Sequence, residues 1–82
     1  MNEFVIGEVL NLITNERDTE YAYRIGRTCF ANEDAIKECN RIALDYGNGR
    51  ALFLTRISSV EKTDKYIWIT TKNRKYRLDR VL

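Results

Sequence analysis

Hydrophobic and polar side chains alternate most regularly in the last third of the chain. Residues 51–59, 65–71 and 75–81 are rich in β-branched and aromatic residues at alternate positions, a pattern that predicts three antiparallel strands. Alternation gives such a sheet an apolar inner face and a polar outer face. The inner face is expected to contain Phe53, Ile57, Ile67, Ile69, Tyr76 and Leu78.

The register of the last hairpin follows from keeping its apolar residues together. A loop with an even number of residues within 72–75 sets Ile69 opposite Leu78. A slip of one residue would set Ile69 opposite Arg77 and mix the two faces. We therefore expect the even register, with Trp68 on the outer face.

The preceding hairpin, through residues 61–63, requires an odd loop on the same reasoning. This register places Arg56 opposite Trp68 on the outer face. Leu52 and Leu54 would then also point outward and would need cover from elsewhere in the chain or from a second copy, because exposed apolar patches usually mark interfaces.

Two further strands are predicted in the first half of the chain. In residues 3–14, β-branched residues, a central glycine and a turn-forming end favour a strand. Helical spacing is also present there, and Asn2 would be the N-cap of that alternative helix. Residues 20–30 alternate cleanly, and a turn over residues 15–19 would join the two strands into a hairpin.

Residues 33–46 carry the clearest helical pattern. Asn32 is a suitable N-cap, and two acidic residues in the first turn suit the helix dipole. Apolar side chains follow at three- and four-residue spacing, and the Gly-Asn-Gly sequence after them is typical of a helix end. The predicted apolar stripe consists of Ala35, Ile36, Cys39, Ile42, Ala43 and Tyr46.

The predicted order of elements is β-β-α-β-β-β, an α+β fold in one domain that spans residues 1–82. One helix packed against a strongly curved antiparallel sheet buries the apolar faces of all six elements. A small, partly open SH3-like or OB-like barrel is one form of this fold, and a flatter α+β sandwich is the other.

Residue usage excludes several classes of site. The chain has no histidine and two cysteines, so it lacks the usual general base of neutral-pH catalysis and the ligands of a four-coordinate zinc site. We therefore expect no catalytic residue, metal or cofactor. Both thiols are expected to be free and buried, with a disulfide as the alternative, in a cytoplasmic protein. No apolar run approaches ~20 residues, so no membrane span is expected.

Charge is distributed unevenly along the chain. Residues 1–49 contain five basic and nine acidic side chains, a net charge of −4. Residues 50–82 contain nine basic and three acidic side chains, a net charge of +6. A molecule polarised in this way orients in the field of a charged partner.

The outer face of the C-terminal sheet predicts a binding surface. Its aromatic side chains could stack on bases or pack against a protein, and its basic side chains could meet phosphates. Cation–π stacking on an ordinary solvated sheet face explains the same pattern without a partner. The candidate partner-binding residues are Arg56, Tyr66, Trp68, Lys72, Arg74, Lys75 and Arg77.

Three tyrosines form a second group. Tyr21, Tyr23 and Tyr46 are expected to lie in the core with their hydroxyl groups at its rim. A ligand pocket lined by these rings is the alternative.

The C-terminal segments ALFLTRISSV (residues 51–60) and YIWITTKNRKYRL (residues 66–78) carry a resemblance. Their pattern, which includes threonine–x–asparagine–x–x–tyrosine–x–leucine, is similar to the ending of many small proteins from bacteriophages and mobile elements of Gram-positive bacteria. The resemblance implies a single-domain viral accessory protein that inhibits a host enzyme or defence system, as anti-restriction and anti-CRISPR proteins do.

Together these observations predict a non-enzymatic, phage-encoded inhibitor that blocks a surface of a host protein in the host cytoplasm. Direct binding of nucleic acid through the same outer face is the first alternative. Sequestration of a nucleotide-like small molecule, in a barrel mouth or a dimer interface, is the second. Both a monomer and a homodimer are compatible with the sequence.

Overall fold

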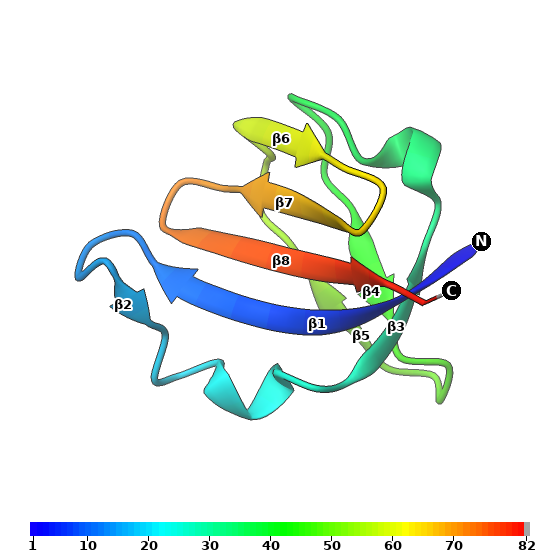
Figure 1. Cartoon of the computed structure of the whole chain (residues 1–82), viewed down its shortest axis with the longest axis horizontal. Helices are drawn as coiled ribbons and strands as arrows, with labels where there is room; N and C mark the ends of the chain where they lie inside the picture. The colour runs from blue at the N-terminus through cyan, green and yellow to red at the C-terminus, as the bar shows by residue number, and fades with distance from the viewer. Residues whose placement is uncertain (82) are drawn as a thin grey trace.

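The computed structural model describes residues 1–81 and shows one curved antiparallel sheet (Figure 1). Its strands follow the order β5-β4-β3-β1-β8-β7-β6, and β2 pairs only with β1. Two single-turn 3₁₀ helices, η1 (Ala22–Arg24) and η2 (Glu33–Ala35), lie in the connections. The strands are β1 (Asn2–Asn11), β2 (Glu16–Arg17), β3 (Thr28–Ala31), β4 (Ala43–Asp45), β5 (Ala51–Phe53), β6 (Ser59–Lys62), β7 (Tyr66–Thr70) and β8 (Arg74–Arg80).

The long strands β1 and β8 form the centre of the sheet (Figure 1). They pair from Phe4 opposite Arg80 to Asn11 opposite Arg74, with a register shift at Gly7. A strand is therefore confirmed in this segment, but it covers Asn2–Asn11 and residues 12–14 of the predicted range form a turn. The inner faces of the sheet and the segments that cover them enclose one core, which consists of Phe4, Ile6, Val9, Cys29, Ala31, Ile36, Leu44, Leu52, Leu54, Ile57, Ile67, Ile69, Tyr76 and Leu78.

The two faces of the β7–β8 hairpin were predicted correctly, but its register is shifted by two residues. Ile69 lies opposite Tyr76, and Ile67 lies opposite Leu78. A shift of two residues keeps every side chain on its predicted face, because the side-chain period of a strand is two. The shift arises because the turn is tighter than predicted, with a backbone hydrogen bond from Thr71 N to Arg74 O of 2.9 Å.

The strand predicted over residues 51–59 is wrong in its extent and in the faces of residues 52–54, although Ile57 is buried as predicted. The chain forms β5, then irregular backbone, then β6, and these two strands pair with different neighbours. Leu52 and Leu54 are buried in the core, whereas Phe53, predicted to be inside, is 78% exposed. Glu61, and not Arg56, lies opposite Trp68. The reason is that Leu52 pairs with Leu44 of β4, which fixes the opposite parity from the one predicted.

β5 and β6 are the two edges of the sheet and are consecutive in the chain. Residues 54–58 lead from one to the other, with backbone hydrogen bonds from Ile57 N to Asn40 O and from Ser58 N to Thr70 O. No ladder joins β5 to β6 within residues 1–81, so the sheet is unclosed and the predicted barrel is not confirmed.

The helix predicted over residues 33–46 does not form. Asn32 does act as a cap, since its side chain accepts a hydrogen bond from Asp34 N, but the capped helix is the single turn η2. A helix with the predicted stripe would have turned Leu44 toward solvent. In the strand β4, Leu44 is fully buried, and Cys39 becomes an exposed residue with a φ of 72°.

Residues 20–30 also form less strand than predicted. Only β3 is extended, because η1 and Gly26, with a φ of 92°, interrupt the segment. Cys29 on β3 is free and buried as predicted, and burial raises the pKa of its thiol to about 11. No helix within residues 1–81 has the length and hydropathy needed to cross a membrane.

Two arginines at the ends of β8 attach irregular segments to the sheet. Arg74 Nε donates to Asp18 Oδ2 at 2.9 Å, and the Asp18 side chain is only 1% exposed. At the other end, the guanidinium of Arg80 binds the carboxylate of Glu33, and its Nε donates to Thr63 O at 2.9 Å. These contacts attach the loop at Asp18 to one end of β8 and the single turn η2 to the other.

We expect the Asp18→Ala variant to lose about 3 kcal/mol of unfolding free energy, because it leaves Arg74 without its buried partner. The Glu33→Ala variant should lose about 1 kcal/mol, because Glu33 and Arg80 both keep some contact with solvent. Urea denaturation followed by Trp68 fluorescence measures both losses. Equal losses would contradict the stronger role assigned to Asp18.

The two carboxylates also predict acid sensitivity. Burial opposes the ionisation of Asp18, but the backbone N–H of Tyr21 and the guanidinium of Arg74 outweigh burial and hold its pKa below the ordinary value. The hydrogen bond from Arg80 lowers the pKa of Glu33 in the same direction. A carboxyl group with a lowered folded-state pKa stabilises the fold fully above its unfolded pKa of about 4, and this contribution is lost as the pH falls through the folded-state pKa.

We therefore expect the unfolding free energy to be steady from pH 7 to about pH 5 and to fall below about pH 4. The Asp18→Asn variant, which cannot titrate at this position, should show a shallower fall. Urea titrations at a series of pH values test this expectation. An acid response as steep in the variant as in the wild type would remove Asp18 from the explanation.

Candidate functional site

The outer face of β7 and β8 contains the predicted aromatic pair. The ring centroids of Tyr66 and Trp68 lie 6.4 Å apart with the planes at 76°, an edge-to-face contact. Lys75 Nζ lies 4.8 Å from the Trp68 ring centroid, and Arg77 Cζ lies 5.8 Å from it. The structure therefore brings together four of the seven candidate residues.

Charges of both signs lie on this outer face. Arg77 Nε donates to Asp79 Oδ1 at 2.8 Å, and Glu61 lies opposite Trp68. The Arg77–Asp79 pair lies over Gly7, where an added Cβ would be 2.1 Å from Asp79 Oδ2. Much of the positive charge predicted for this face is thus compensated within it, which makes it a poor match for a row of phosphates.

The other three candidate residues lie apart from the aromatic pair. Arg74 turns to the inner side of the sheet, where it binds Asp18 and Glu20. Arg56 and Lys72 are exposed and line a separate pocket. The lining of that pocket consists of Glu38, Cys39, Arg56, Ile57, Ser58 and Lys72.

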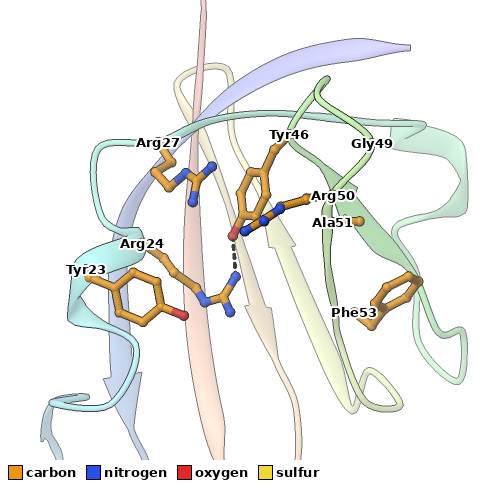
Figure 2. A pocket seen from close by; sticks show the side chains of 8 residues that line it. All are labelled: Tyr23, Arg24, Arg27, Tyr46, Gly49, Arg50, Ala51 and Phe53. Atoms are coloured by element: carbon orange, nitrogen blue, oxygen red, sulfur yellow. Dashed lines mark hydrogen bonds between the residues drawn. The ribbon is translucent and has the colours of Figure 1, made fainter.

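A different pocket, of about 420 Å³, opens between η1 and the β4–β5 hairpin (Figure 2). This volume lies within the range of small-ligand sites. Figure 2 shows side chains from the η1 segment on one wall and side chains from the hairpin on the other. We call it the arginine–tyrosine pocket, and its lining consists of Tyr23, Arg24, Arg27, Tyr46, Gly49, Arg50, Ala51 and Phe53.

The β4–β5 turn presents Arg50 to this pocket. Gly47 and Gly49 have φ values of 82° and 81°, in the left-handed region that favours glycine. The side chain of Asp45 accepts a hydrogen bond from Gly47 N at 2.7 Å, and that of Asn48 accepts one from Arg50 N at 3.1 Å. The sequence predicted to end a helix therefore builds a hairpin turn.

The opposite wall is held in place by Asp18. Its Oδ1 accepts a hydrogen bond from Tyr21 N at 2.8 Å, and the Arg74 guanidinium carbon lies 4.0 Å from the Tyr21 ring centroid. Arg24 contacts the same ring, with its Cζ 5.1 Å from the centroid. The buried ion pair thus positions the turn that carries Arg24 and Tyr23.

Arg24 is enclosed by aromatic rings but keeps unused hydrogen-bonding capacity. Its Cζ lies 4.9 Å from the Tyr23 ring centroid and 5.9 Å from that of Tyr46, and its Nη1 donates to the Tyr46 hydroxyl at 2.6 Å. Its Nε is buried and has no hydrogen-bond partner within residues 1–81. Burial alone would lower the pKa of Arg24, but the contacts with Tyr46 and Tyr23 together outweigh burial and raise the pKa above its ordinary value. The guanidinium group therefore stays charged.

The charged side chains that line the pocket are all positive. Arg27 Cζ lies 4.0 Å from the Tyr46 ring centroid. In the part of the chain that is described, Arg24, Arg27 and Arg50 form no ion pair, and no carboxylate lines the pocket. Residues 1–81 hold no group of three or more carboxylates or thiols able to bind a metal ion. This arrangement suits an anion.

The sequence interpretation missed this pocket for two reasons. Tyr23 was expected in the core, yet it is 64% exposed. Arg24 and Arg27 belong to the half of the chain with a net negative charge, so their local surroundings appeared unfavourable for an anion. The available signal was the alternative of a tyrosine-lined pocket, together with arginines spaced closely around Tyr23.

Comparisons with protein-family models, with curated proteins and with solved structures find no match to this chain.

Gly7 provides a test of the compensated outer face. Its φ lies outside the left-handed region, so alanine is compatible with the backbone. We expect Gly7→Ala to cost about 1 kcal/mol of unfolding free energy, because the new methyl group displaces the Arg77–Asp79 pair. In an Asp79→Ala background the same change should be neutral or stabilising, since it restricts the unfolded chain. A double-mutant cycle from urea denaturation measures the coupling free energy between the Gly7 and Asp79 substitutions. Additive effects of the two substitutions would contradict a clash between the added methyl group and Asp79.

Proposed function

We propose that this protein is a non-enzymatic binding protein that captures a phosphate-bearing ligand in the arginine–tyrosine pocket. One observation carries the proposal. Arg24, Arg27 and Arg50 line one pocket and form no ion pair within residues 1–81. Unpaired arginines at this density repel one another, and an anion between them relieves the repulsion.

The chemistry of the guanidinium group favours phosphate. Its planar set of N–H donors matches phosphate oxygens in pairs, and these charge-assisted hydrogen bonds are among the strongest in proteins. The tyrosine rings contact the guanidinium groups of Arg24 and Arg27, which holds these side chains in place without neutralising them. Arg24 Nε, buried without a partner, is a donor that a phosphate oxygen can satisfy.

Binding without catalysis fits the same lining. The charged side chains that line the pocket are arginines, and no histidine, carboxylate or thiol is among its lining residues. General acid–base catalysis works best with a group whose pKa lies near the working pH. The pocket therefore offers recognition but no proton acceptor.

The outer face of β7–β8 supports a second candidate function, the phage-encoded inhibitor expected from the sequence. Tyr66 and Trp68 form a fixed aromatic pair with Lys75 against the indole. Aromatic side chains held in this way are typical anchors of protein–protein contacts. Blocking a host protein through this face remains a prediction.

Inorganic tripolyphosphate is the probe for the first function. We expect the wild type to bind it at low salt in isothermal titration calorimetry, and Arg50→Gln to weaken binding about 10- to 150-fold, because one charge-assisted contact contributes ~1.5–3 kcal/mol. Arg50 is exposed, so its replacement should leave the fold intact. Lys65→Gln, an exposed site in the β6–β7 turn, removes one charge without touching the pocket and is the matched control.

No binding by the wild type at low salt would refute the proposal. Equal losses in Arg50→Gln and Lys65→Gln would indicate a response to net charge alone. Loss of binding in Lys75→Gln, with Arg50→Gln unaffected, would transfer the anion site to the outer face.

A further inference from the structure

We infer that the ligand of the arginine–tyrosine pocket is a single-stranded nucleic acid, whose phosphates contact the arginines while one base stacks on Phe53. This inference rests on the proposed function and specifies its ligand. It uses two features that phosphate binding alone leaves unexplained: an exposed phenylalanine at the pocket and the concave shape of the site.

Phe53 is an apolar side chain of the sheet whose exposure the packing of the core does not explain. It is 78% exposed on the edge strand β5, while its neighbours Leu52 and Leu54 are each 4% exposed. The leucines therefore anchor this part of the chain, and the phenyl ring contributes little to the core. An exposed aromatic ring beside positive charge is the arrangement by which proteins stack single-stranded bases.

Tyr23 provides a second ring on the opposite wall (Figure 2). It is 64% exposed, and Arg24 lies against it with Cζ at 4.9 Å from the ring centroid. Guanidinium groups and aromatic rings thus line the same pocket. A ligand that carries anionic groups and flat apolar groups in close succession matches this lining, and a nucleotide chain has that composition.

The shape of the site favours a single strand over a duplex. Proteins read a duplex by inserting a helix or a β-ribbon into a groove, which requires a protruding element. The arginine–tyrosine pocket is instead a hollow of about 420 Å³. Bases of a single strand can be turned out into such a hollow, whereas paired bases are already stacked on their neighbours.

Fluorescence anisotropy with labelled decathymidylate tests the inference, alongside an abasic oligomer with the same number of phosphates. We expect the wild type to bind decathymidylate about 5- to 150-fold more tightly than the abasic oligomer, the range given by one stacked base. Phe53→Ala should remove this difference, and Phe53→Tyr should restore it. Ile13→Ala, also 78% exposed and apolar but outside the pocket, is the matched control.

The outcomes separate the inference from the proposed function. Equal binding of the two oligomers, both weakened by Arg50→Gln, would overturn the base contact and leave phosphate capture standing. Decathymidylate binding that Arg50→Gln does not weaken would overturn both. A wild type that is dimeric, with Phe53→Ala monomeric and unchanged in decathymidylate affinity, would assign Phe53 to self-association and overturn the inference.

Salt dependence provides an independent measure. Three phosphate contacts predict that the association constant for decathymidylate falls about a hundredfold for each tenfold rise in salt. Arg50→Gln should make this dependence shallower. A slope that is the same in both proteins would contradict contact between Arg50 and the strand.

Discussion

The ion pair between Arg74 and Asp18 is the constraint on which both the fold and the arginine–tyrosine pocket depend. A carboxylate that is 1% exposed is tolerated only with a charged partner and full hydrogen bonding. Asp18 obtains both, from Arg74 and from Tyr21 N. Because the same contacts fix the chain just before η1, they also determine where Arg24 lies. The contacts of Asp18 therefore fix one end of a core that is covered by almost no helix.

Charge along the chain and charge in space differ in this protein. Arg74 and Arg80 belong to the basic C-terminal half, but their ion pairs are with carboxylates of the acidic half. Arg24 and Arg27 belong to the acidic half, but they have no carboxylate partner within residues 1–81 and line a pocket with Arg50 from the other half. The pocket lined by three arginines therefore lies outside the most basic stretch of the sequence, and a count of charges along the chain could not have located it.

The parts of the fold that were predictable are those that the local sequence decides. Side-chain alternation indicates β7 and β8, and their inner faces tolerate an error of two residues in register. The β-branched residues, the central glycine and the turn that follows favoured a strand at β1. The burial of Leu44 and the exposure of Phe53 depend instead on which strands pair in the folded protein. Leu44 is buried because β4 pairs with β5, and Phe53 is exposed because the same pairing turns Leu52 inward. Local patterns that fit both a helix and a strand cannot resolve that choice.

The pairing of β1 with β8 joins residues near opposite ends of the described chain, as Phe4 opposite Arg80 illustrates. The central contact of the sheet therefore requires closure of the longest loop available, at an entropic cost that precedes any gain from burial. Topologies dominated by such distant contacts fold in milliseconds to seconds, not microseconds. During synthesis, β1 is made long before β8, its central partner in the sheet. The apolar face of β1 is therefore exposed until β8 has been synthesised.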